Sequence, residues 1–134
     1  MLSIWLHDIG HYPLPTEIDH AIRSENIARE FLKKESVNEE EIQKILHCIR
    51  AHRVKDVQPQ SMEAKIIACA DSASHMTDII YIDMAKNKMI KQALDKLERD
   101  FRDLSLFPRI KEQLTEVYES WKKLLNSLNT LEMD

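Results

Sequence analysis

The sequence predicts an all-helical protein. Its 134 residues include one glycine and four prolines, and a chain rich in β-hairpins needs many more turn residues than these. Apolar residues recur at helical spacing through most of the chain. The composition, 43% hydrophobic and 31% charged, is typical of a folded protein. We therefore expect one all-α domain over residues 1–134, a bundle of about five to six helices.

The chain opens with a short apolar run, residues 1–6, that reads as the last turns of a helix. A helix this short cannot persist alone in water, so the run must pack against other parts of the chain. We expect Trp5, Leu6 and Ile9 to be core-bound, with the polar pair after Leu6 placed among them. Gly10 then permits a backbone turn that other residues resist.

A second helix is predicted over about residues 19–34. Two prolines make residues 11–16 a loop, and either Thr16 or Asp19 can cap the helix that follows. The predicted apolar stripe of this helix consists of Ile22, Ala28, Phe31 and Leu32.

Two further helices follow in the first half of the chain. Asn38, with Glu41 three residues later, forms a capping box that begins a third helix, and this helix ends at about His52. A polar loop over residues 53–61 precedes a fourth helix that begins near Met62.

The second half of the chain reads as two long amphipathic helices. We expect one helix over residues 82–104 and, after Pro108, a last helix over residues 109–128. Their Lys- and Glu-rich faces are solvated, and we read no catalytic motif in residues 83–134.

Charge and composition limit the classes of partner. A net charge of −4 argues against a nucleic-acid binder, whereas a small phosphorylated substrate stays compatible because a bound metal can supply local positive charge. Cys48 and Cys69 lie on apolar helix faces and read as reduced core residues. The opening run is too short for a signal peptide and no segment reaches membrane-spanning length. We expect a cytoplasmic protein without membrane association, and a homo-oligomer remains compatible with the sequence.

The adjacent pair His7 and Asp8 is the first candidate site. It follows an apolar run and precedes Gly10, with His11 close by. A buried carboxylate needs a partner, and a carboxylate–imidazole pair is commonly neutralised by a metal or by mutual contact. An Asp carboxylate can bridge two divalent ions, while a neutral imidazole offers one nitrogen. We expect both residues to be metal ligands.

Asp71 is the second candidate, because the residues around it are small or apolar. An unpartnered carboxylate there would be costly, so Asp71 is either a metal ligand, which we favour, or one half of a salt bridge. His75, four residues later, can share its helix face but reads as a polar edge residue.

His20 and His52 sit at helix ends beside the two polar loops. Each can complete a second metal position or line a substrate pocket. The alternative is an exposed helix-end histidine, which is electrostatically favourable at a helix C-terminus in the case of His52. His47 lies about 140° around the helix from His52, so we take it as structural.

Basic side chains near these positions are candidates for binding a phosphate. Most Arg and Lys residues are instead solvated surface, and that alternative stays open. With His11, the candidate substrate-binding residues are Arg23, Arg53 and Lys65. The sequence contains no glycine-rich phosphate loop, CxxC pair or nucleophile elbow.

In order and spacing, these residues resemble the HD-domain superfamily of metal-dependent phosphohydrolases, in its HDIG form. The resemblance covers residues 2 to about 76. It rests on His7-Asp8-Ile9-Gly10, His20 with Ser24, Ala28 and Phe31, Ile49-Arg50-Ala51-His52-Arg53, Pro59, Glu63-Ala64-Lys65-Ile66 and Asp71.

The resemblance implies an all-α bundle that binds one or two divalent metals, such as Fe, Mn, Mg, Ni or Zn. A metal-activated water would then attack a phosphomonoester or phosphodiester, often of a nucleotide. His7, Asp8 and Asp71 would hold the main metal, and Asp8 would bridge to a second metal held by His20 and His52. The loops over residues 12–17 and 53–60 would frame the substrate pocket.

One member of the family pattern has no counterpart here. The first histidine of the family lies a few tens of residues before the HD pair, and only six residues precede His7. Fewer ligands imply weaker metal binding and positions filled by water. We therefore carry three interpretations: a phosphohydrolase, a catalytically silent HD-fold module that binds a ligand or protein, and a helical interaction domain with a structural His–Asp pair.

Overall fold

The computed structural model describes residues 2–12 and 17–131. Within these residues the chain forms seven α-helices and two short 3-10 helices, and no strand. The predicted all-α fold is confirmed, with more helices than the five to six expected. Thr16 as a cap, and most of the loop predicted over residues 11–16, lie outside the described residues. The chain divides into two compact units, Met1–Ala68 and Cys69–Asp134, and the single domain stays a prediction.

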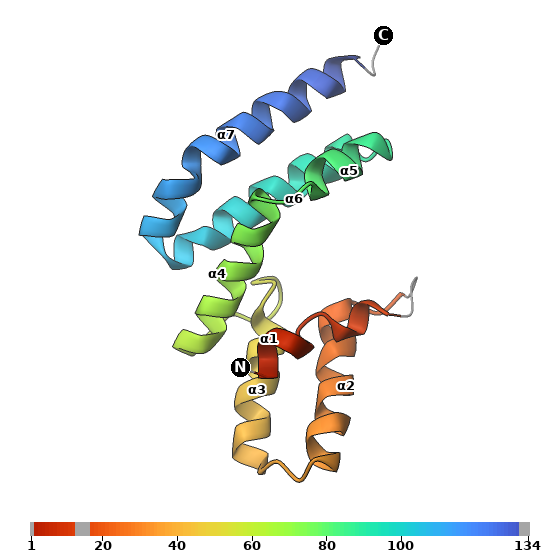
Figure 1. Ribbon diagram of the computed structural model, residues 1–134, viewed down its shortest axis with the longest axis vertical. Coiled ribbons are helices and arrows are strands. Elements are labelled where there is room, and N and C mark those ends of the chain that lie inside the picture. The colour runs from red at the N-terminus through yellow and green to blue at the C-terminus, as the bar shows by residue number, and fades with distance from the viewer. Residues whose placement is uncertain (1, 13–16, 132–134) are drawn as a thin grey trace. The chain divides into compact units, whose positions relative to one another are not determined.

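The first unit is built around two antiparallel helices, α2 and α3, which lie side by side (Figure 1). The short helix α1 packs against α3, and the 3-10 helix η1 packs against α2. The elements of this unit are α1 (Leu2–Leu6), η1 (Ile9–His11), α2 (His20–Lys34), α3 (Glu39–Ala51) and the beginning of α4 (Met62–Met76).

Side-chain caps define where α2 and α3 begin. The Asp19 carboxylate accepts a hydrogen bond from the Ala21 N–H at 2.9 Å, so Asp19 is the cap of α2. Asn38 accepts from the Glu41 N–H at 2.9 Å, and its amide donates to the Glu41 carboxylate at 3.3 Å. Asn38 is therefore confirmed as the cap of α3, whereas the Glu41 carboxylate contacts the Asn38 side-chain amide and not the backbone N–H that a capping box would use.

Two apolar clusters hold the first unit together. The first joins α1, α2 and α3, and the second joins α3 to the first turns of α4. Their buried residues are Leu6, Ala28, Leu32, Ile42, Leu46 and Ile49 in the first, and Cys48, Ala51, Ala64 and Ile67 in the second.

The expectation that Trp5 and Ile9 are core-bound is wrong. Trp5 is 81% exposed and Ile9 is 39% exposed. Only Ser3 and Leu6 of α1 are buried. They are three residues apart and so share one face, and a helix of five residues presents no more than one such face to α3.

Gly10 is required for a reason other than the expected turn. Its φ is not positive, so the backbone conformation there does not demand glycine. A Cβ at this position would instead overlap the carbonyl oxygen of His20 and the backbone nitrogen of Ser24. The Gly10 N–H also donates to the Ser24 hydroxyl at 2.9 Å. Glycine thus lets η1 approach the backbone of α2.

The second unit consists of the end of α4 and three helices that pack against one another (Figure 1). Its elements after α4 are α5 (Ile80–Lys86), α6 (Ile90–Asp103), the 3-10 helix η2 (Leu104–Leu106) and α7 (Pro108–Leu131). The largest fully buried side chains of its core are Tyr81, Met76, Leu97, Leu104 and Leu125.

The single helix expected over residues 82–104 is wrong, because a tight turn separates α5 from α6. Lys88 has a φ of 61°, and its N–H donates to the Ala85 carbonyl at 2.9 Å. The Met89 N–H donates to the Met84 carbonyl at 3.0 Å. This left-handed helix ending usually uses glycine. With lysine in that place, the sequence carried no signal for the break.

The expectation for the two cysteines is met. Cys48 and Cys69 are both buried and form no disulfide, as expected of core residues. No helix among the described residues is both long and apolar enough to cross a bilayer.

Candidate metal centre

The Asp8 carboxylate, in the turn between α1 and η1, faces four histidines. Its Oδ1 lies 3.4 Å from His20 Nε2, 3.5 Å from His52 Nε2 and 3.7 Å from His11 Nε2. Its Oδ2 lies 3.6 Å from His7 Nε2. The side chain as a whole is 44% exposed, yet Oδ1 itself is buried and accepts no hydrogen bond. A buried carboxylate oxygen without a donor is costly unless a cation reaches it.

Two of these imidazoles are held in the tautomer that suits a metal ligand. The Nδ1 atom of His7 lies 2.8 Å from the Ile4 carbonyl oxygen, and that of His52 lies 2.6 Å from the Ile49 carbonyl oxygen. A carbonyl only accepts hydrogen bonds, so Nδ1 carries the proton in each ring. In a neutral ring bonded in this way, Nε2 is the nitrogen that can ligate a cation.

Asp8, His20 and His52 place their ligand atoms at the corners of a nearly equilateral triangle. The His20 and His52 Nε2 atoms are 3.3 Å apart, and Asp8 Oδ1 is 3.4 Å and 3.5 Å from them. A four-coordinate ion with bonds of about 2.1 Å keeps its ligand atoms roughly 3.4 Å apart. These three residues thus fit a divalent metal without rearrangement.

The surroundings of His20 keep its ring neutral. The pKa of His20 is lowered to about 4, chiefly by burial and also by the nearby His11 and Arg53 side chains, and Asp8 offsets only part of this. The His11 ring stacks on His20 with centroids 4.0 Å apart. At neutral pH the His20 imidazole is therefore unprotonated and available as a ligand.

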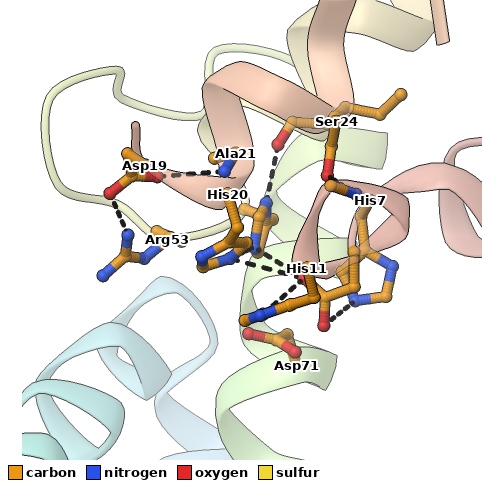
Figure 2. A network of polar contacts seen from close by, with 12 residues as sticks. His7, His11, Asp19, His20, Ala21, Ser24, Arg53 and Asp71 are labelled. Carbon is orange, nitrogen blue, oxygen red and sulfur yellow. Dashed lines mark hydrogen bonds and ion pairs between the residues drawn. The ribbon is translucent and has the colours of Figure 1, made fainter. Parts of the chain in front are cut away.

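An ion pair lies directly beside His20. Figure 2 shows Asp19 and Arg53 joined at this position. Burial alone would raise the pKa of the Asp19 carboxyl, but the Ala21 N–H and the Arg53 guanidinium hold it below its usual range. The charged pair is therefore intact at neutral pH.

The structure brings together most of the residues predicted for the site. Five of them converge, and the role expected for each stays a prediction. These residues are His7, Asp8, His11, His20 and His52. The alternative of an exposed helix-end histidine is wrong for His52, which is 1% exposed, because its ring turns back under the last turn of α3 to the Ile49 carbonyl.

The remaining candidates lie on neighbouring elements. Arg23 lies on α2 one turn after His20, and Lys65 lies in the first turns of α4. Asp71 also lies on α4, in the second unit, and its assignment stays a prediction. His47 accepts a hydrogen bond from the Gln60 N–H at 3.0 Å, which is a structural contact to the loop before α4.

Sequence reasoning missed a buried polar network in the second unit. Asp100 is 6% exposed and accepts a hydrogen bond from the Tyr81 hydroxyl at 2.7 Å. Lys96 and His75 contact the same carboxylate, each at 3.2 Å. His75, which we expected to be a polar edge residue, is 21% exposed and takes part in this network. The available signal was an aspartate within the apolar stripe of α6, three residues after Leu97.

The comparison with family models agrees with this geometry. The model of the HD domain matches residues 1–76, which is more than half of the chain. The chain therefore belongs to the HD domain family, whose members are generally hydrolases and typically bind divalent metals. Asp8, His20 and His52 all lie within the matched residues. Neither a curated protein nor a solved structure matches the chain.

Proposed function

We propose that the chain is a metal-dependent phosphohydrolase that acts on a small phosphorylated metabolite or a nucleotide, as a phosphomonoester or a phosphodiester. The observation that carries the proposal is the buried Asp8 Oδ1, which has no hydrogen-bond donor and faces imidazole nitrogens. A cation satisfies this oxygen, whereas a purely structural His–Asp pair would be expected to hydrogen-bond directly.

The two oxygens of Asp8 face different imidazoles. Oδ1 faces His20 and His52, whereas Oδ2 faces His7. This division supports a carboxylate that bridges two metal positions, one with His20 and His52 and the other with His7. We assign Asp71 to the position of His7 on the family resemblance alone.

A bound divalent ion would act as a Lewis acid, lowering the pKa of water and offsetting the charge of a phosphoryl group. The side chains around it would bind and orient the substrate. His11 is 41% exposed and stacked on His20, so one imidazole edge is free to contact a phosphate. We assign Arg23, Arg53 and Lys65 to the same anionic substrate.

Metal content is the direct test of this proposal. The protein as isolated, and after reconstitution with Mn²⁺, Fe²⁺ or Mg²⁺, would be examined by elemental analysis beside Asp8→Ala. His47→Gln is the matched control, because it also removes a potential ligand but one that only contacts the Gln60 N–H. We expect metal in the parent and in His47→Gln, and none in Asp8→Ala.

Hydrolysis then separates an enzyme from a silent binding module. The same three proteins would be screened against phosphomonoesters, phosphodiesters and nucleotides with each metal added. Turnover that Asp8→Ala abolishes is the expected result. Metal binding without turnover of any phosphoester would favour the silent HD-fold module, and full activity of Asp8→Ala would refute the proposal.

A further inference from the structure

Two pairs of adjacent residues meet at the candidate metal centre. Asp19 and His20 begin α2, and His52 and Arg53 follow the end of α3. The imidazoles approach with their Nε2 atoms 3.3 Å apart, and the Asp19 carboxylate accepts a hydrogen bond from the Arg53 guanidinium beside them (Figure 2). Each imidazole is thus the direct chain neighbour of one partner in an ion pair.

The Asp19 carboxylate makes two contacts at once. Its Oδ1 accepts from the Ala21 N–H at 2.9 Å, which fixes the first turn of α2. Its Oδ2 accepts from Arg53, with the Lys55 ammonium 3.8 Å away. Hydrogen bonds between charged groups are stronger than neutral ones, and both partners are about three-quarters buried. One side chain therefore ties the beginning of α2 to the end of α3.

The two imidazoles differ in how they are held. The His52 ring is buried and bonded to its own helix through the Ile49 carbonyl. His20 lies in the first turn of α2, where backbone N–H groups lack helical partners and the position depends on the cap. A cap that is also bonded to Arg53 places His20 relative to His52.

The charges of the pair cancel at the site. A guanidinium beside His20 would by itself repel a metal ion, and it contributes to the low pKa of that ring. The carboxylate of Asp19 offsets this charge. The pair can therefore position the ligands without adding a net charge beside the metal.

We propose that Asp19 and Arg53 form a clamp that holds His20 and His52 at the separation a metal ion requires. Both are positioning residues, since they act through the two imidazoles, and Asp19 thereby joins the site. The proposal rests on the metal site of the proposed function. The clamp and the assignment of Arg53 to the substrate make different predictions. If Arg53 only binds substrate, changing Arg53 alters KM, and changing Asp19 leaves the metal affinity unaltered.

Metal affinity of the metal-free protein tests the clamp. Mn²⁺ would be titrated by calorimetry into the parent chain, Asp19→Ser, Arg53→Gln and the double variant. Serine caps a helix as well as aspartate but is too short to reach Arg53. We expect each single variant to raise the Kd about 10- to 100-fold, as the loss of outer-shell support does elsewhere. The double variant should bind Mn²⁺ no more weakly than the weaker-binding single variant, because both substitutions remove the same ion pair.

Two controls sharpen the result. Asp56 lies in the same loop as Arg53 and forms an ion pair with Arg50. Asp56→Asn weakens that ion pair and should leave the Kd for Mn²⁺ unchanged. Asp19→Asn keeps an uncharged hydrogen-bond acceptor for Arg53. This variant should therefore retain part of the metal affinity that is lost in Asp19→Ser. A Kd for Mn²⁺ in Asp19→Ser within about twofold of the parent value would overturn the clamp. Tighter Mn²⁺ binding in Arg53→Gln would also overturn it, because Arg53 would then act on the metal only through its charge.

A second readout does not need the metal. The His20 and His52 rings have centroids 5.3 Å apart, close enough for a nuclear Overhauser effect between their ring protons. We expect this signal in the parent and in Asp56→Asn, and its loss in Asp19→Ser. If the parent binds no metal, the proposed function fails. The clamp is then refuted if the signal persists in Asp19→Ser and is upheld as a positioning device if the signal is lost.

Discussion

His20 and His52 are 32 residues apart in the chain, and their Nε2 atoms lie 3.3 Å apart. Because His52 carries its proton on Nδ1, bonded to the Ile49 carbonyl, its Nε2 is an acceptor. One proton, on His20 Nε2, can therefore serve the pair in the metal-free protein, and a second, on His52 Nε2, would set two N–H groups against each other. With its proton on Nδ1 instead, His20 would offer the Nε2 lone pair, and His20, His52 and Asp8 would together hold a metal ion.

The low pKa of His20 leads to a pH dependence of stability in the metal-free protein. The folded-state pKa is about 4, below the ordinary value of 6.5. Between these values the unfolded chain binds a proton at His20 and the folded chain does not. The stability contribution is therefore fully present above pH 6.5 and is lost as the pH falls toward 4.

Proton NMR and urea unfolding check this prediction. The His20 ring protons should titrate near pH 4, and the fall in unfolding free energy between pH 6.5 and 4.5 should be smaller in His20→Gln than in the parent. A His20 titration near 6.5 would contradict it.

Asp8→Asn should separate metal binding from stability. The Asp8 Oδ1 accepts no hydrogen bond, so the loss of its charge removes no bond from the metal-free fold. We expect an unfolding free energy within about 1 kcal/mol of the parent, together with a Kd for Mn²⁺ at least roughly 100-fold higher. Calorimetry and urea unfolding give the two quantities. A loss of more than about 2 kcal/mol would mean that the carboxylate is structural.

Gly10→Ala should destabilise the first unit. The added Cβ would overlap backbone atoms of His20 and Ser24, which cannot move as a flexible side chain would. Overpacking of this kind costs about 2–3 kcal/mol, measured by urea unfolding. Ser24→Ala, which removes only the acceptor for the Gly10 N–H, should cost about 1 kcal/mol. Equal effects of the two variants would show that close packing is not what Gly10 provides.

Tyr81→Phe tests the buried network of the second unit. The Tyr81 hydroxyl donates to the buried Asp100 carboxylate at 2.7 Å, so the variant leaves a buried acceptor with fewer partners. We expect a loss of about 1–3 kcal/mol in thermal or urea unfolding. Tyr118→Phe is the comparison, because its hydroxyl contacts the exposed Glu98, and it should cost less than about 1 kcal/mol. A Tyr81→Phe protein as stable as the parent would show that the network does not support the fold.

The beginnings of α2 and α3 were predictable because their signals are local. A cap such as Asp19 or Asn38 acts on backbone N–H groups two or three residues away, so both partners are adjacent in the sequence. The break at Lys88 was not predictable, since the left-handed conformation there is imposed on a residue that does not favour it. The exposure of Trp5 also depended on which face of a short helix meets α3.

The sequence by itself determined which side chains are available for metal chemistry. The family match over residues 1–76 includes His7, Asp8, His20 and His52, and ligand chemistry belongs to residue types. Their convergence on the two oxygens of one carboxylate was an expectation until the fold placed them together.

Only the tertiary structure decided how these side chains are supported. Four contacts depend on the folded backbone. They are the carbonyl contacts that set the proton positions on His52 and His7, the pairing of Asp19 with Arg53, and the contact of His75 with Asp100. Two of these contacts join residues that are distant in the sequence, and the other two require a helical turn that tertiary packing stabilises. Distance in space between remote residues is set by packing, and no local pattern encodes it.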